Sequence, residues 1–494
     1  MLRYIALIFI TICISIHFSS CKKDKLLTDS SAKVVFSQDS VLFDTVFTTI
    51  GSTTRNIRII NKNKQKIKVS SVYLEQGQSS PFTLNVDGSP GKSFSDIEIP
   101  ANDSIFVFIQ VNVNPTNQNS PLVITDRIMV NVNGNEEHVK LEAWGQDAYY
   151  HMPNKAIQYQ NGFLPYSTVS TQTNVTVTWN NDKPHVVYGW LVVDSTQKLV
   201  INQGVRVYFH QNAGLWVFRY GTLQVNGLQG QEVTFQGDRR ESDYADLPGQ
   251  WDRIWINEGS NNNYINYAKI KNSYIGIQAE SIYGNPADPG RLKVTNTVVQ
   301  NCSKWGLYAV GYKMFLGNSI IMNCKEYCAA FTVGGTYTAI NTTFANYWNQ
   351  DGGRGGQPCV HIDNYYVSGG VNHVVAMDSA YFGNCIITGS QSNELEIDVK
   401  TSALPLSYTF SYSMLTTTNG TANSHYDNCR ITPNANFEDP ANYYMKPKST
   451  SAAIDMGTGA YQNDAPYSFL STDITGSGVR NIGTNVDAGA YEVQ

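Results

Sequence analysis

The segment Thr297-Val298-Val299-Gln300-Asn301-Cys302 recurs as Ser319-Ile320-Ile321-Met322-Asn323-Cys324, and this repetition decides the fold. Related segments occupy residues 268–272, 342–346 and 385–389. Their aligned Asn or Gly positions are separated by 29 (272 to 301), 22, 23 and 43 (346 to 389) residues. Loop-like insertions account for the longer steps and leave a unit of about 22 residues, and a strand-containing repeat of this length predicts a solenoid.

The type of solenoid follows from what the repeat lacks. It has no L-x-x-L-x-L-x-x-N pattern, which excludes leucine-rich repeats and favours a right-handed parallel β-helix over residues 154–494. Each coil is expected to hold three short strands, with coils about 4.8 Å apart. Asn tolerates the left-handed backbone of a tight turn, and Asn at one position in successive coils can form an amide ladder.

Segments before and after the repeat support this prediction. Gly204-Val205 and Gly221-Thr222-Leu223 begin further coil-like stretches, and residues 453–457 and 487–492 carry I-D-M-G and D-A-G-A-Y-E patterns. Together these segments resemble the pectin-lyase-like β-helix lipoproteins of Gram-negative bacteria. The resemblance implies a β-helix whose C-terminal motif caps the last coil. It implies no particular chemistry, because members of this group often have no assigned activity.

Residues 33–148 alternate between apolar and polar side chains, as in Ile105-Phe106-Val107-Phe108-Ile109. Alternation broken at short intervals by Gly, Asn, Pro and Ser predicts an antiparallel β-sandwich. The order of Phe43-Asp44-Thr45-Val46-Phe47, Pro81-Phe82 and residues 139–145 resembles bacterial immunoglobulin-like domains of the ASPM/SPD-2/Hydin type. We interpret this domain as a spacer, with direct ligand binding as the alternative.

Residues 1–20 have the pattern of a secretory signal, because Arg3 precedes an apolar stretch too short to span a bilayer core of about 30 Å. Phe18-Ser19-Ser20-Cys21 resembles the lipobox of bacterial lipoproteins, which implies cleavage before Cys21 and attachment of acyl chains such as palmitate there. An incidental Cys after an ordinary signal peptide is the alternative. Residues 21–32 are then a lipidated tether. Lys22-Lys23-Asp24-Lys25 resembles tags for the cell-surface side of the outer membrane, or is simply a solvated linker.

Composition limits the partners. Only 15% of the 494 residues are charged and the formal net charge is −5, so the sequence gives no electrostatic footprint for nucleic acid. Cys302 and Cys324 share a repeat position, so a disulfide between them is one alternative. Free thiols that fill an internal column of the coils are the simpler interpretation. The cysteines whose state the sequence leaves undecided are Cys302, Cys324, Cys328, Cys359, Cys385 and Cys429.

No cofactor or metal is predicted. The Cys324/Cys328 pair has no second pair or His at zinc-site spacing. His361 with Asp363 is a minor metal candidate. Carboxylate-rich loops leave calcium open, but no EF-hand or nonapeptide calcium repeat is present.

The insertion 237–251 is the densest charge cluster of the solenoid. A polysaccharide lyase needs cations and a base, and a glycosidase needs two carboxylates about 5–5.5 Å or 6.5–9.5 Å apart. The structural alternative is surface ion pairing worth about 0–1 kcal/mol per pair. The candidate catalytic residues are Asp238, Arg239, Arg240, Asp243 and Asp246. The same loop also contains Glu241. The aromatic candidates for stacking on sugars are Trp216, Trp255, Trp305 and Tyr312, with packing between coils as the alternative.

Two functions remain open. The first is a lipid-anchored, non-catalytic surface protein whose β-helix binds extracellular polysaccharide or mediates adhesion. The second is a polysaccharide lyase or glycoside hydrolase of the pectin-lyase-like superfamily, which rests on fold analogy alone. The carboxylate spacing in the charged insertion is expected to separate them.

Overall fold

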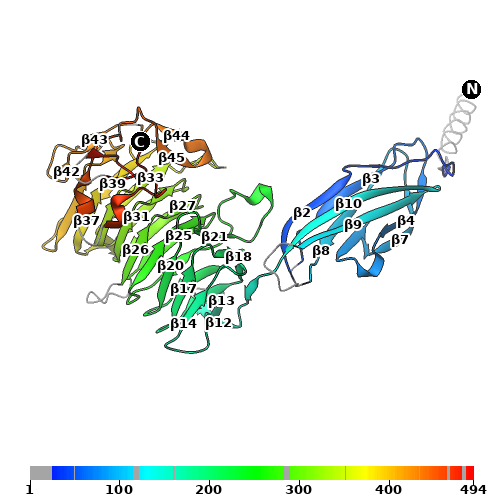
Figure 1. Cartoon of the computed structure of the whole chain (residues 1–494), viewed down its shortest axis with the longest axis horizontal. Coiled ribbons are helices and arrows are strands. Elements are labelled where there is room, and N and C mark those ends of the chain that lie inside the picture. Colours follow the sequence, from blue (N-terminus) through cyan, green and yellow to red (C-terminus); the bar gives the residue numbers. More distant parts are fainter. Residues whose placement is uncertain are drawn as a thin grey trace, which may run out of the picture. The chain divides into compact units, whose positions relative to one another are not determined.

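The protein is all-β, as predicted, and divides into two compact units between Asp147 and Ala148 (Figure 1). The structure is a computed structural model that describes residues 25–48, 51–114, 122–159, 162–281, 290–350, 352–432, 434–463, 468–480 and 485–493. Cys21 and the predicted signal lie outside these ranges. Within them, no helix has the length and apolar character needed to cross a membrane.

The first unit is a sandwich of two five-stranded sheets. In spatial order the first sheet contains β1 (Val35–Phe36), β3 (Arg55–Ile60), β8 (Ser104–Val111), β5 (Phe82–Val86) and β6 (Ser89–Gly91). The second contains β2 (Ser40–Phe47), β10 (Asn135–Gln146), β9 (Leu122–Val132), β4 (Ile67–Leu74) and β7 (Ser93–Ile99). A short 3₁₀ helix, η1 (Gly77–Ser79), lies between β4 and β5.

The period-two alternation fixes which side chains enter the sandwich core. Ile105, Val107 and Ile109 of β8 are buried, whereas Phe106 and Phe108 between them are exposed. One pairing differs from the antiparallel expectation, because β2 runs parallel to β10. Alternation specifies the faces of a strand but not its direction, so the sequence pattern could not reveal this mixed sheet.

The second unit is a parallel β-helix with three long sheets, here called sheets 1, 2 and 3 (Figure 1). Sheet 1 contains β11 (Tyr149–His151), β15 (His185–Val187), β18 (Arg206–Phe209), β21 (Val233–Gly237), β24 (Ala268–Lys271), β27 (Val298–Gln300), β30 (Ile320–Met322), β33 (Thr343–Asn346), β38 (Ile386–Gly389), β41 (Met414–Leu415) and β43 (Arg430–Ile431). Sheet 2 contains β12 (Lys155–Tyr159), β13 (Gly162–Thr168), β16 (Trp190–Val193), β19 (Gly214–Val217), β22 (Ile254–Ile256), β25 (Ile275–Glu280), β28 (Trp305–Val310), β31 (Ala329–Thr332), β34 (Val360–Asp363) and β39 (Leu395–Asp398). Sheet 3 contains β14 (Thr176–Trp179), β17 (Lys198–Asn202), β20 (Thr222–Asn226), β23 (Asn263–Asn266), β26 (Arg291–Thr295), β29 (Lys313–Gly317), β32 (Gly335–Ile340), β37 (Met377–Gly383), β40 (Leu406–Ser411) and β42 (Tyr426–Asp427).

Short elements complete the unit. They are the pairs β35 (Tyr365–Ser368) with β36 (Val371–Val374), β44 (Phe437–Asp439) with β45 (Tyr444–Pro447), and β46 (Gly457–Thr458) with β47 (Asn485–Val486). Four 3₁₀ helices are η2 (Ser242–Tyr244), η3 (Pro440–Asn442), η4 (Gly459–Asn463) and η5 (Ser468–Ser471).

The strand register confirms the predicted repeat. Gln300 of β27 pairs with Met322 of β30, which pairs with Ala345 of β33, so Asn301 and Asn323 occupy one position in successive coils. Asn346 pairs with Gly389 across the largest step, as the sequence alignment predicts. The coils therefore stack in the register that the Asn and Gly positions define.

The predicted amide ladder forms in part. Asn301 Nδ2 donates to Asn272 Oδ1 at 2.7 Å, and Asn272, Asn301 and Asn323 all adopt positive φ angles of 50–64°. A second column, after sheet 3, was not predicted. There Asn318 Nδ2 donates to Asn296 Oδ1 at 3.3 Å, and Asn384 Nδ2 donates to Asn341 Oδ1 at 3.0 Å. Both columns hold the sharp turns between sheets.

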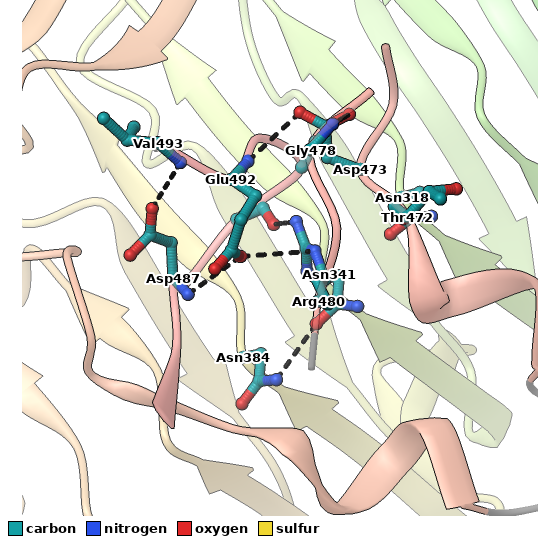
Figure 2. A network of polar contacts seen from close by, with 12 residues as sticks. Asn318, Asn341, Asn384, Thr472, Asp473, Gly478, Arg480, Asp487, Glu492 and Val493 are labelled. Atoms are coloured by element: carbon teal, nitrogen blue, oxygen red, sulfur yellow. Dashed lines mark hydrogen bonds and ion pairs between the residues drawn. The ribbon is translucent and has the colours of Figure 1, made fainter. Parts of the chain in front are cut away.

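The D-A-G-A-Y-E segment lies along the side of the coils. Gly489 N donates to Asn384 O at 2.8 Å and Ala490 N donates to Thr343 Oγ1 at 3.0 Å. Arg480, fully buried, donates from Nη2 to Gly489 O at 2.8 Å and lies 3.6 Å from Glu492 Oε2 (Figure 2). The C-terminal motif thus covers the flank formed by the second Asn column, whereas the resemblance placed it on the last coil.

Candidate functional site

The outer face of sheet 1 is largely covered over its C-terminal coils. Ile320, Met322 and Ile386 point outward from sheet 1 and are buried against apolar side chains of residues 435–490, such as Phe437 and Ala490. Residues 435–490 therefore prevent a ligand from reaching this part of the β-helix surface.

The aromatic candidates are used mostly for packing. Trp216 and Trp255 are adjacent in the register of sheet 2, and their rings stack on each other at 4.8 Å, so each ring has one face covered by the other. The ring of Trp305 packs at a tilt of 56° against that of Tyr308, with the centroids 4.2 Å apart, and Trp305 Nε1 donates to Glu326 Oε2 at 2.7 Å. Tyr312 has 0% exposure and donates its hydroxyl to Ser260 O, so it is a core residue without access to a ligand.

The charged candidates pair locally. Asp238 accepts from His210 at 2.7 Å, Arg239 pairs with Glu241 at 3.0 Å, and Asp246 lies 3.8 Å from Lys271. Asp243 contacts Ser242 at 3.4 Å in an exposed position. Each of the four loop carboxylates thus contacts a different neighbouring side chain.

A groove of about 600 Å³, which we call the sheet-3 groove, lies on the outer face of sheet 3. It crosses the coils of β20, β23, β26, β29 and β32. The lining contains three cations, two aromatic rings and several amides and hydroxyls, but no Asp or Glu. Its residues are Gln224, Asn262, Asn263, Tyr264, Arg291, Leu292, Lys293, Lys313, Met314, Phe315, Thr336 and Thr338.

The register places these side chains in two rows parallel to the helix axis. One row contains Tyr264, Lys293 and Phe315 in three consecutive coils. The other contains Arg291 and Lys313 in two consecutive coils. Because parallel strands are about 4.8 Å apart, Tyr264 and Phe315 are about 10 Å apart along the axis, with Lys293 between them.

Lys293 lies at the centre of the groove among aromatic rings. Its Nζ is 5.7 Å from the ring centroids of both Tyr264 and Phe315, and 4.1 Å from that of Phe469 in η5. Burial lowers the pKa of this amine. Contacts at these distances attract the ammonium through the ring quadrupoles and hold it in the groove.

The groove carries positive charge that no carboxylate of the described residues neutralises through an ion pair. None of the carboxylates in the described ranges forms an ion pair with Arg291, Lys293 or Lys313. In a chain with a formal charge of −5, three such cations on one face create a local field that favours an anionic ligand.

Sequence reasoning missed this groove, although a signal was present. Arg-Leu-Lys-Val-Thr at 291–295 and Lys-Met-Phe-Leu-Gly at 313–317 each alternate outward charged or aromatic residues with buried apolar ones. The step from Arg291 to Lys313 is 22 residues, one repeat unit. Aligning cations as well as Asn residues across coils would have found the stripe.

The minor metal candidate has a different arrangement. His361 Nδ1 lies 2.7 Å from Glu396 Oε2 and Nε2 lies 2.9 Å from Asp363 Oδ2. Burial opposes the charged imidazole, but these two hydrogen bonds raise the pKa of His361. Since both bonds can form at once only when both ring nitrogens carry protons, the geometry favours an imidazolium rather than a ligand. The described residues contain no group of three or more His, Cys, Asp or Glu that could hold a metal ion.

The solenoid cysteines are free thiols in the structure, and five of the six are buried. Cys302 Sγ lies 3.3 Å from Ser273 Oγ. Ser273, Cys302 and Cys324 are buried at one position in successive coils, where their small side chains fill the core.

Comparisons with known proteins give only short and weak matches. No protein-family model matches the chain, and neither does any curated protein sequence. Similar solved structures include a family 123 glycoside hydrolase from Clostridium perfringens, with 10% identity over 23% of this chain and 25% of that chain and a TM-score of 0.16. They also include a PapD-like domain of human CEP192, with 12% identity over 26% of this chain and 95% of that chain and a TM-score of 0.17. A third is the YadV chaperone, with 14% identity over 23% of this chain and 51% of that chain and a TM-score of 0.16.

Proposed function

We propose that this protein binds an acidic extracellular polysaccharide along the sheet-3 groove. The observation that carries the proposal is the alignment of Arg291, Lys293 and Lys313 with Tyr264 and Phe315 on the outer face of sheet 3. Guanidinium and ammonium groups recognise carboxylates or sulfates, and flat rings pack against the apolar faces of sugars. The hydroxyl and amide groups of Thr336, Thr338 and Gln224 can then bond to ring hydroxyls.

The geometry favours an extended polymer over a compact ligand. The groove lining crosses five coils, from Gln224 on β20 to Thr338 on β32, and the rings of Tyr264 and Phe315 are two coils apart. A 1,4-linked sugar chain advances by about one coil spacing per residue. Every second sugar would therefore meet a ring, and the residue between them would lie beside Lys293.

The test is a binding panel of acidic and neutral polysaccharides against the full chain, measured by calorimetry at several salt concentrations. Acidic polymers should bind, and binding should weaken with salt because the contacts are charged. K293M and R291M should each weaken binding about 10- to 100-fold, since hydrogen bonds to charged groups contribute about 1.5–3 kcal/mol.

The matched control is K198M. Lys198 is an outward cation of the same sheet on β17, outside the groove lining. Equal losses in K198M and K293M would contradict a localised site, and binding of neutral polymers alone would exclude an acidic ligand.

A second candidate is a polysaccharide lyase, favoured by the lowered pKa of Lys293, because a larger fraction of neutral amine can act as a base. The amine would take the proton next to the uronate carboxylate while Arg291 and Lys313 neutralise the developing charge. The electron pair forms a carbon–carbon double bond, and the glycosidic bond at the β carbon breaks, its oxygen taking a proton from water. A glycosidase pair is not supplied here, since no carboxylate lines the groove.

K293R separates binding from elimination, because Arg keeps the charge but is not a base at neutral pH. New unsaturated ends, followed by ultraviolet absorbance, should appear with the unmodified protein and vanish in K293R while binding persists. Binding without unsaturated or reducing ends leaves the non-catalytic function.

We also propose attachment to the outer membrane through acyl chains on Cys21, with the β-sandwich as a spacer between lipid and β-helix. The support is the sequence pattern around Cys21. Labelled palmitate should be incorporated into the protein and lost in C21A. Retention of the label in C21A would exclude this anchor.

A further inference from the structure

The charged loop that follows β21 forms a second, smaller pocket on another face of the β-helix. The loop returns over the outer side of sheet 1, and a cavity of about 200 Å³ lies between the loop and the strands. Its lining residues are Gln236, Gly237, Arg239, Arg240, Tyr244, Ala245, Gln250, Lys271 and Asn272. No carboxylate is among them, although the loop contains four.

The cations of this loop pocket are incompletely neutralised. Arg239 pairs with Glu241 and stacks 3.7 Å over the ring of Tyr244. Arg240 contacts the hydroxyl and ring of Tyr208 and has no ion pair with any described carboxylate. Two acidic partners thus face three cations, because Lys271 has only the distant Asp246.

Lys271 is less exposed than Arg239. Its side chain is 21% exposed, and its Nζ donates to Ala245 O at 2.8 Å, whereas Asp246 Oδ1 lies 3.8 Å away and is 49% exposed. Burial lowers the pKa of Lys271, Asp246 opposes this, and the nearby Lys269 and Arg240 lower the pKa further. Like charges held this close in a partly buried cavity favour an anion between them.

The walls of the pocket are fixed before any ligand enters. Gln250 Nε2 donates to Tyr244 O at 2.6 Å and to Leu247 O at 2.8 Å. Asn272 Nδ2 donates to Ala245 O at 2.9 Å, and Asn301 Nδ2 donates to Asp246 O. The first Asn column of the β-helix therefore anchors the loop, so little conformational entropy is lost when a ligand binds.

We propose that the loop pocket binds a tetrahedral oxyanion, a sulfate or phosphate group, through Arg239, Arg240 and Lys271. The guanidinium groups supply forked N–H donors and the ammonium a point charge, which is the donor set that such oxyanions need. The cavity has room for one such group but not for an extended polymer. This site is separate from the sheet-3 groove, and its fate does not depend on the proposed polysaccharide binding.

The experiment is isothermal calorimetry of the full chain with sodium sulfate, sodium phosphate and a sulfated monosaccharide at constant ionic strength, with chloride as the competing anion. Saturable one-to-one binding of the free ions supports an inorganic ligand. Stronger binding of the sulfated sugar shows that the group is read as an ester. Absence of saturable binding for all three overturns the proposal.

Variants assign the site. K271M should weaken binding at least tenfold, and D246N should tighten it, because Asp246 competes with the ligand for Lys271. K269M is the matched control, since Lys269 is an exposed cation on the same face of β24, two residues away and outside the lining. D246N carries the test if K271M fails to fold. Weaker or unchanged binding in D246N, or equal effects of K269M and K271M, would refute the assignment.

Discussion

Replacement of Arg480 by Met is expected to detach the C-terminal segment 485–493 from the flank of the β-helix. The guanidinium is fully buried, and the carboxyl groups of Glu492, Asp473 and Asp487 interact with it electrostatically (Figure 2). Each carboxylate also accepts backbone N–H groups, as Asp473 Oδ2 does from Glu492 N at 3.2 Å. Without the cation, these carboxylates would remain buried with no compensating charge.

The magnitude follows from this uncompensated burial. Removing one partner of a buried ion pair costs about 3–5 kcal/mol, which corresponds to two to almost four orders of magnitude in an equilibrium constant. The loss should be local, because the segment contacts the coils at a few places such as Thr343 and Asn384. The expected result is faster hydrogen exchange of the amides of Glu492 and Val493 by up to that factor.

The assay is amide hydrogen exchange by mass spectrometry on the full chain. R430M is the control, because Arg430 is an exposed cation whose guanidinium donates to Ala452 O, and its replacement should leave exchange in 485–493 unchanged. The double variant R480M/E492Q should lose less protection than R480M, since it removes one of the stranded charges. Unchanged protection in R480M would refute the electrostatic account of this segment.

Three further predictions concern stability. Burial raises the pKa of Glu492 to about 7 from 4.5, so the folded protein holds this proton more tightly than the unfolded chain. Stability should therefore fall as pH rises from about 4.5 to about 7. In denaturant titrations E492Q should reduce this loss of unfolding free energy, and an equal loss in E492Q would contradict the prediction. Burial lowers the pKa of His151 to about 4, so the unfolded chain binds a proton at this residue from about pH 6.5 downward, before the folded protein does, and stability also falls on acidification. H151Q should reduce the dependence of stability on pH between about 6.5 and 4, and an equal dependence in H151Q would contradict the prediction. I265A should lower the free energy of unfolding by about 2–5 kcal/mol because Ile265 is fully buried in sheet 3, and a loss below about 1 kcal/mol would show that the core collapses around the cavity.

The sequence predicts the fold well because stacking imposes a period. Asn301 and Asn323 had to align once each coil returned to the same turn, and their positive φ angles explain why Asn recurs there. The direction of β2 relative to β10 has no such periodic signature, since residues that alternate between faces look the same in either direction.

The candidate site could be predicted only in part, because tertiary packing decides which residues cover the outer face of each sheet. Trp216 and Trp255 are both outward-facing, as an aromatic platform requires, but register places them one coil apart and they stack on each other. Arg239 and Arg240 were singled out with the carboxylates of their loop, yet only the cations line the pocket beneath it. Whether neighbouring charges in the sequence share a cavity depends on which way the loop folds back.

The position of the sheet-3 groove follows from how the other two faces are used. Sheet 1 loses its outer face to residues 435–490 and to the loop after β21. On sheet 2, outward groups satisfy one another, as His361 does with Glu396 and Trp216 Nε1 with Asn257 Oδ1 at 2.6 Å. Sheet 3 keeps Arg291, Lys293 and Lys313 without ion-pair partners among the described carboxylates. Charge that the fold leaves unsatisfied is available to a ligand, so this is the face on which binding should be sought first.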